Sequence, residues 1–176
     1  MWQVSPIGRP VVSEPSSHEY TRGLGYCLIQ GRGFDPKRGA KLGAWSANTF
    51  GNDTACDWIW QVTESDDLSV VARALSDALA GGADDLDADL GSLGLGAAEV
   101  VARLRGRGST PDAYTENLDD WVREHQALDT DALLPQARQV VDRVSIKDSE
   151  LRDLWEESES FDDWMEVVSD LRRRLS

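Results

Sequence analysis

The chain has 176 residues, seven Trp and a formal net charge of −14, and a domain of this length buries roughly 70% of its unfolded surface. This excess of carboxylates argues against nucleic-acid binding, which depends on Lys and Arg beside phosphates. No apolar run approaches the ~18 residues of a membrane span, and no signal-peptide pattern opens the chain. We therefore expect a cytoplasmic protein that binds neither nucleic acid nor membrane. The low Lys content favours a bacterial gene of high G+C content.

Residues 1–42 differ from the rest of the chain. They are rich in Gly, Pro, Ser and Arg, with six basic and three acidic residues, whereas residues 43–176 have twelve basic and 29 acidic residues. We expect this leader to be disordered or loosely packed, with at most a small two-stranded element. An over-extended gene start or a dispensable tail would explain it, so the leader is not assumed to be native.

From residue 53 onward, apolar residues at spacings of three and four predict helices. Asn52 or Asp53 can cap the first one. The acidic, Gly-punctuated stretch 81–96 predicts a connector loop. Thr130 is expected to cap a later helix, in whose first turns Pro135 is tolerated. The predicted helices cover about residues 53–62, 67–80, 97–104, 116–127, 131–145, a short segment with Leu151, Leu154 and Trp155, and 161–175.

The last helix has the clearest pattern. Ser160 can cap it, Asp162 and Asp163 lie at its positive end, and Arg172–Arg174 lie at its negative end. These arginines fit a helix C-terminus better than a functional basic patch. The stripe has only about two heptads, too few for a free-standing coiled coil, so we expect a monomer with Trp164 buried. The apolar stripe consists of Phe161, Trp164, Val168, Leu171 and Leu175.

Together these patterns predict an all-α fold. We expect one compact bundle of six to seven helices with an irregular, Trp-anchored N-terminal segment. A parallel α/β sheet is not expected, because runs of β-branched residues are absent.

The sequence has few motifs that indicate catalysis or cofactor binding. There is no metal-ligand spacing, no phosphate-binding loop and no nucleophile elbow. The two histidines, His18 and His125, lie among polar residues far apart in the sequence. We expect no catalytic residue, no metal and no cofactor, which favours a protein that is not an enzyme.

The most unusual stretch is LGAWSANTFGNDTACDW, residues 42–58. It resembles the opening signature of an uncharacterised bacterial family, domain of unknown function 4259, whose pattern is GAWGxGxFxNDxAxDW. Ser46 and Asn48 stand where the family prefers Gly. The resemblance covers about residues 43–175 and implies no activity. The matching residues are Gly43, Ala44, Trp45, Phe50, Asn52, Asp53, Ala55, Asp57 and Trp58.

Two interpretations of this motif stay open. Trp45, Phe50 and Trp58 can anchor the N-terminal segment to the bundle, much as a hydrophobic staple fixes the entry to a helix. Alternatively, the motif is a recognition surface in which carboxylates line a groove beside Trp side chains. The candidate binding residues are Trp45, Asn52, Asp53, Asp57, Trp58 and Glu99.

Two functions are compatible with these features. The first is a non-enzymatic interaction protein whose acidic surface binds a basic protein, for example an immunity-type inhibitor of a basic toxin, since acidic surfaces steer such association. The second is a small enzyme or ligand-binding protein that uses carboxylates and Trp around residues 45–58 on a cationic or sugar-like ligand.

Overall fold

The computed structural model describes residues 44, 46–80, 86–112, 114–147 and 149–176. The predictions for the leader and for Trp45 lie outside these residues. The described chain has seven helices and no strand beyond one bridge between Ala44 and Asn52, which confirms the all-α prediction. The helices are α3 (Asp53–Thr63), α4 (Ser69–Leu79), α5 (Ala88–Leu104), α6 (Glu116–Glu124), α7 (Leu134–Val144), α8 (Glu150–Glu156) and α9 (Phe161–Arg174).

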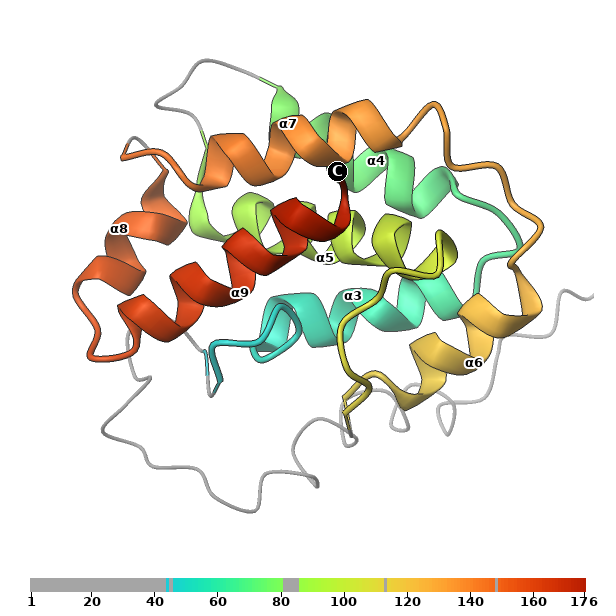
Figure 1. The fold of residues 1–176 in the computed structure, drawn as a ribbon, viewed down its shortest axis with the longest axis horizontal. Helices are drawn as coiled ribbons and strands as arrows, with labels where there is room; N and C mark the ends of the chain where they lie inside the picture. The colour runs from blue at the N-terminus through green and yellow to red at the C-terminus, as the bar shows by residue number, and fades with distance from the viewer. Residues whose placement is uncertain (1–43, 45, 81–85, 113, 148) are drawn as a thin grey trace, which may run out of the picture.

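Helix α5 is the centre of the bundle. It contacts all six of the other described helices, and Figure 1 shows it crossing the middle of the molecule between α3 on one side and α4 and α7 on the other. Most of its residues from Gly91 to Arg103 are buried. A helix that is surrounded on all sides has no polar face, so its sequence shows no amphipathic period.

The predicted loop over 81–96 is therefore wrong for residues 88–96, which form the first half of α5. The side chain of Asp87 accepts a hydrogen bond from the backbone N–H of Leu90 and caps this helix. The glycines allow close packing rather than breaking the helix. A Cβ atom on Gly94 would lie 2.7 Å from Cγ1 of Val140 and 2.8 Å from Cβ of Ala78, so α4 and α7 approach α5 at this point.

The outer helices follow the predicted periodicity more closely. In α9, Trp164 is buried, as predicted, and its ring stacks on that of Trp155 with a centroid distance of 5.9 Å. Ser160 is the N-cap residue of α9, but its side chain makes no capping hydrogen bond. None of the described helices is both long enough and apolar enough to span a bilayer.

The expected cap of α7 is a further correction. The helix begins at Leu134 with Leu133 as its N-cap residue and Pro135 in the first turn. Thr130 precedes a tight turn, in which its carbonyl oxygen accepts from Leu133 and Leu134. Its hydroxyl accepts a hydrogen bond from Arg105 and caps no helix. The predicted cap was therefore three residues too early.

Candidate interaction groove

The motif forms a tight loop that leads into α3. The N–H of Gly51 donates to the carbonyl oxygen of Asn48, and the N–H of Ser46 donates to that of Gly51. A Cβ atom at Gly51 would lie 2.6 Å from Cβ of Ser46, so this position requires glycine. No described residue other than glycine has a positive φ. Ser46 and Asn48 therefore replace the family's preferred glycines without backbone strain.

Asn52 and two aromatic residues fix this loop on the bundle. The Asn52 side chain accepts a 2.8 Å hydrogen bond from the backbone N–H of Ala55 and caps α3. Phe50 and Trp58 are buried, and both lie within 3.3 Å of the position that a Cβ atom on Gly96 would occupy. Because Gly96 lacks a side chain, both rings can rest on α5. This arrangement supports the anchoring interpretation for Phe50, Asn52 and Trp58.

The structure places the candidate carboxylates apart. Asp53 and Asp57 are exposed on α3. Glu99 is fully buried in α5. Both oxygen atoms of Glu99 have partners, since Oε1 accepts from the backbone N–H of Ser109 at 2.8 Å and Oε2 accepts from Nη2 of Arg174 at 2.7 Å. These three carboxylates therefore do not meet.

Glu99 belongs to a buried polar network that joins α5, α6 and α9. Nε of Arg103 lies 3.1 Å from Oε1 of Glu99, and Nη1 of Arg103 is paired with Asp119. Asp119 also accepts a hydrogen bond from the hydroxyl of Thr115. Removing an ionised member of such a network leaves a buried charge without its partner, so the network fixes how the three helices sit together.

Arg174 connects this network to the surface. Its Nε donates to Asp170 at 2.6 Å, and its Nη1 donates to the carbonyl oxygen of Arg107 at 2.8 Å. Partial burial alone would lower the pKa of Arg174, but hydrogen bonds and charges from Glu99 and Asp170 outweigh that effect and raise it. Arg174 thus stays protonated and holds the end of α9 against α5.

A groove of about 580 Å³ lies beside this network. We call it the acidic groove. Its walls are the motif loop at residues 47–50, the segment 109–112 and the outer side of α9. Asn48 crosses between the first two walls, since its amide donates to Asp112 at 3.3 Å. The ionisable residues that line the groove are Asp112, Asp163, Glu166, Asp170, Arg173 and Arg174.

The carboxylates of the groove differ in their partners. Asp170 pairs with both Arg173 and Arg174. Asp112, Asp163 and Glu166 form no ion pair within the described residues, and of these only Asp163 and Glu166 are exposed, since Asp112 is half-buried and accepts a hydrogen bond from Asn48. The groove therefore offers two exposed negative charges without an ion-pair partner next to apolar atoms of Phe50 and Val167, which suits a cationic side chain with an apolar stem. No group of His, Cys, Asp and Glu in the described part of the chain could hold a metal ion.

Sequence reasoning missed most of this groove. Asp163 was interpreted only through the helix dipole, and Ser109, Glu166 and Arg174 had no assigned role as a site. Of the candidate residues, Asn52 and Trp58 support the motif loop, Glu99 lies in the network beneath the groove, and Asp53 and Asp57 do not line it. No local pattern could link residues 47–50 to α9, because more than a hundred positions separate them in the sequence.

Comparison with known proteins identifies the family. The model of Domain of unknown function (DUF4259) matches residues 43–167, and the chain belongs to that family. Neither a curated protein nor a solved structure matches the chain.

Proposed function

We propose that this member of an uncharacterised family is a non-enzymatic interaction protein of the bacterial cytoplasm, and that its acidic groove binds a basic segment of a partner protein. An inhibitor of a basic toxin is one concrete form of this function. The protein acts as a monomer, and its partner supplies Lys or Arg side chains to the groove.

One observation carries the proposal: Asp163 and Glu166 line a hollow beside the family motif without an ion-pair partner in the described chain. Each charge attracts a cation, and the chain's net charge of −14 adds a long-range field. Such fields raise association rates and weaken as salt increases. The buried network under the groove keeps its walls in place, so little ordering is needed on binding.

The test is a titration with a fluorescent Lys-rich peptide. We compare the wild type with two variants that each remove two charges, Asp163→Asn/Glu166→Gln in the groove and Asp53→Asn/Asp57→Asn on α3. We expect the groove variant to bind on the order of fivefold to tenfold more weakly at low salt, since exposed ion pairs contribute modestly. The α3 variant should bind almost as tightly as the wild type.

Two outcomes contradict the proposal. Equal weakening by both variants would show that only net charge matters, and weakening by the α3 variant alone would move the site to the exposed face of α3. In native cells, the protein should co-purify with a basic protein that is released at high salt. Its gene neighbours identify candidates for that partner, with a toxin gene as the outcome expected of an inhibitor.

The alternative function, a small enzyme or ligand-binding protein around residues 45–58, requires its carboxylates beside one hollow. Glu99 is enclosed and pairs with Arg174, while Asp53 and Asp57 point to solvent from α3. No specific contact among the described residues favours that function over the interaction protein.

A further inference from the structure

Asp112 differs from the exposed carboxylates of the acidic groove. It is half-buried, whereas Asp163 and Glu166 are exposed. It lies on the wall that residues 109–112 form. Its backbone N–H donates to the hydroxyl of Thr115, a residue that is 1% exposed. The backbone of Asp112 is therefore anchored to the core of the bundle.

The two oxygen atoms of the Asp112 carboxylate have different partners. Oδ1 accepts a hydrogen bond of 2.9 Å from the backbone N–H of Tyr114, which fixes the orientation of the carboxylate. Oδ2 accepts from the side-chain amide of Asn48 at 3.3 Å, which exceeds the usual length of roughly 2.7–3.2 Å. Asn48 is exposed and belongs to the motif loop. Oδ2 thus has a weak, neutral donor, and no described cation pairs with Asp112.

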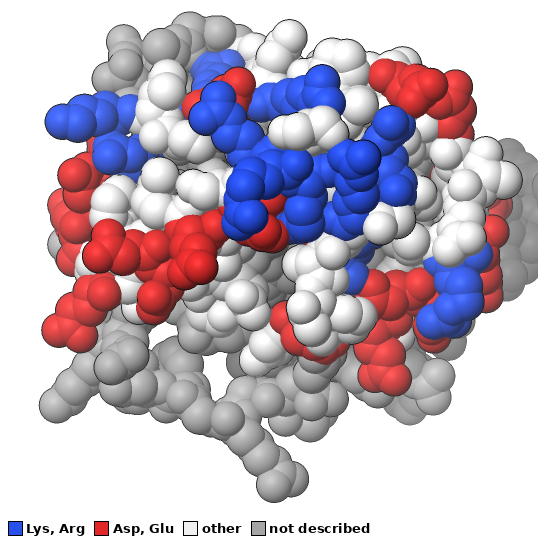
Figure 2. Space-filling view, viewed as in Figure 1, with Lys and Arg blue, Asp and Glu red and all other residues white. Residues whose placement is uncertain are grey.

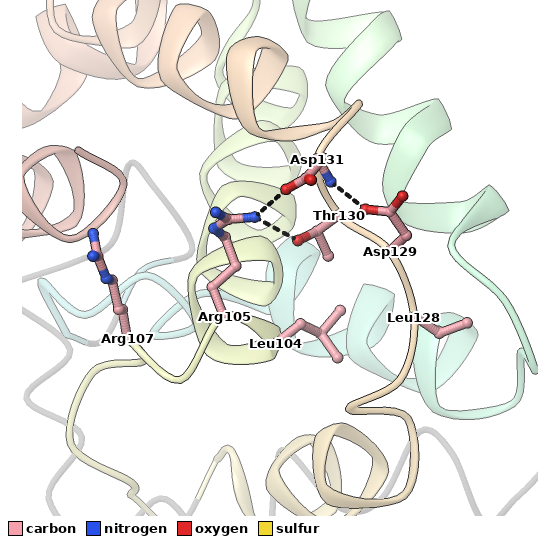
Figure 3. Close-up of a pocket in the computed structure, with 7 residues that line it drawn as sticks. All are labelled: Leu104, Arg105, Arg107, Leu128, Asp129, Thr130 and Asp131. Atoms are coloured by element: carbon pink, nitrogen blue, oxygen red, sulfur yellow. Dashed lines mark hydrogen bonds and ion pairs between the residues drawn. The ribbon is translucent and has the colours of Figure 1, made fainter.

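A hollow of about 340 Å³ at the end of α5 provides a contrast. There, Nη1 of Arg105 lies 2.8 Å from Asp131 and also donates to the hydroxyl of Thr130. Figure 3 shows the guanidinium group of Arg105 turned toward both residues. An incoming cation would have to displace a charged donor from Asp131. At Asp112 it would have to displace only an amide.

A cationic side chain has an electrostatic advantage over the amide of Asn48. Lys or Arg brings a full positive charge to the carboxylate, whereas the amide brings only a dipole. Partly buried ion pairs are also screened by salt less than exposed ones. The charge of a partner is therefore expected to act more strongly, and at higher salt, on Asp112 than on Asp163 or Glu166.

The charge of the surrounding surface directs a cation to this groove. On the face that Figure 2 shows, basic atoms gather in the middle, and acidic atoms lie beside them on the side where α9 begins. Asp163 and Glu166 belong to the first half of α9 and line the same hollow as Asp112. A Lys or Arg side chain that these exposed carboxylates attract thus arrives in the hollow that Asp112 lines.

We propose that Asp112 is a further binding residue of the acidic groove, and that the amide of Asn48 occupies it until a Lys or Arg side chain of the partner takes its place. This inference rests on the proposed function. The released amide turns to solvent, since Asn48 is exposed. Because a ligand must displace the amide to reach Asp112, Asn48 selects for segments that carry a full positive charge at this point.

The experiment titrates the whole chain with the fluorescent Lys-rich peptide and measures the dissociation constant. The variants are Asn48→Ala, which removes the amide, Asp112→Asn, which removes the charge, and the two combined. Asn48 does not have a positive φ, so Ala fits its backbone. Thr49→Ala is the matched control, because Thr49 lines the same groove and its side chain forms no hydrogen bond within the described residues. Thermal unfolding establishes that each variant is folded.

We expect Asn48→Ala to bind the peptide about twofold to fivefold more tightly, because the peptide no longer competes with a hydrogen bond. Asp112→Asn should bind about twofold to fivefold more weakly. This loss should persist at salt concentrations that abolish the effect of the Asp163→Asn/Glu166→Gln variant. In the Asp112→Asn background, Asn48→Ala should give no gain, because the competition has no carboxylate left. Thr49→Ala should leave the affinity unchanged.

Nuclear magnetic resonance adds a measurement that needs only the wild type. The side-chain amide signals of Asn48 should shift as the peptide is added, and unshifted signals would overturn the inference. Weaker or unchanged binding by Asn48→Ala, or an equal gain from it in the Asp112→Asn background, would also overturn it. Binding that depends on Asp163 and Glu166 alone would overturn this inference and keep the proposed function. No peptide binding by the wild type would overturn the proposed function itself, and this inference with it.

Discussion

Two stretches of this chain, residues 88–96 at the start of α5 and residues 161–174 in α9, are both helical but differ in their surroundings. Helix α9 lies on the outside, so its buried stripe and its charged faces alternate with the helical period. From Gly91 onward the start of α5 is enclosed by α3, α4, α7 and α8, and residues 91–96 hold three glycines and no charged residue. Hydrophobic periodicity therefore identifies helices that keep one face in water, and it fails for a helix that keeps none.

Because α9 buries only one face, we predict that its apolar stripe contributes much of the free energy that holds α9 on the bundle. Trp164→Ala removes a ring that is 3% exposed and stacks on Trp155. We expect a loss of about 3–5 kcal/mol in the free energy of unfolding, measured in urea, because a large cavity remains. Ser169→Ala, at an exposed position of the same helix, should change stability by less than about 0.5 kcal/mol.

Light scattering completes this test. We expect a monomer for the wild type, because Trp164 packs within its own chain. A stable dimer that dissociates into folded monomers when Trp164 is replaced would show that the stripe is an interface between copies.

The second prediction concerns the polar interior of α5. Glu99→Gln removes a buried charge that Arg103 and Arg174 share, and we expect a loss of about 3 kcal/mol because each arginine then keeps only one carboxylate partner, Asp119 or Asp170. Arg173→Gln breaks an ion pair whose side chains are 73% and 40% exposed. That control should cost less than about 1 kcal/mol.

A double-mutant cycle with Glu99→Gln and Arg174→Gln sharpens this result. The two losses should not add, because each substitution already breaks the same contact. Additive losses would contradict the pairing of Glu99 with Arg174.

The third prediction tests the glycines directly. Gly94→Ala adds a methyl group within 2.8 Å of side-chain atoms from both α4 and α7. Overpacking of this kind costs about 1–3 kcal/mol, which exceeds the gain of up to ~1 kcal/mol from the higher helix propensity of Ala. Gly94→Ala should therefore lower the midpoint of urea unfolding. A rise would show that the helices can move apart at this position.

The sequence predicted the outer helices because their signals are local. The stripe of α9, Pro135 in the first turn of α7 and the cap of α3 by Asn52 all depend on residues within a few positions of each other. The central helix could not be predicted in the same way. Gly94 faces Val140 and Gly91 faces Leu151, both far along the chain in sequence. A single sequence does not reveal those neighbours.

The features of the site also differ in whether they depend on nearby or on distant residues. Burial of Trp58 and Phe50 follows from their apolar character, and the cap at Asn52 follows from its place before a helix. The groove brings residues 47–50 beside α9, and the paired state of Glu99 depends on Arg174. The groove and the pairing of Glu99 both depend on how the other helices pack around α5. The first half of α5 is the segment that the sequence pattern wrongly predicts as a loop.

The fourth prediction concerns the N-cap of α3, a local signal that the sequence shows directly. Asn52→Ala removes the acceptor for the N–H of Ala55 and should cost about 1 kcal/mol. Asp53→Ala, in the first turn but without the capping hydrogen bond, should cost less, about 0.3–1 kcal/mol through the helix dipole. Urea unfolding of both variants decides between them, and a larger loss at Asp53 would reassign the cap.

The smallest expected effect is a pH dependence at the start of α4. The side chain of Asp67 accepts a 2.8 Å hydrogen bond from the backbone N–H of Ser69, and hydrogen bonds with Ser69 lower the pKa of this carboxyl. A lowered pKa in the folded state stabilises the protein above the ordinary Asp range, and that contribution is lost as the pH falls from about 4 through the folded value. We expect Asp67→Asn to lower the stability at neutral pH slightly and to reduce its decline under acid. Asp66→Asn removes the same charge one residue earlier and serves as the control. Acid-induced unfolding curves of the two variants should therefore differ, and identical curves would show that the contact with Ser69 does not stabilise α4.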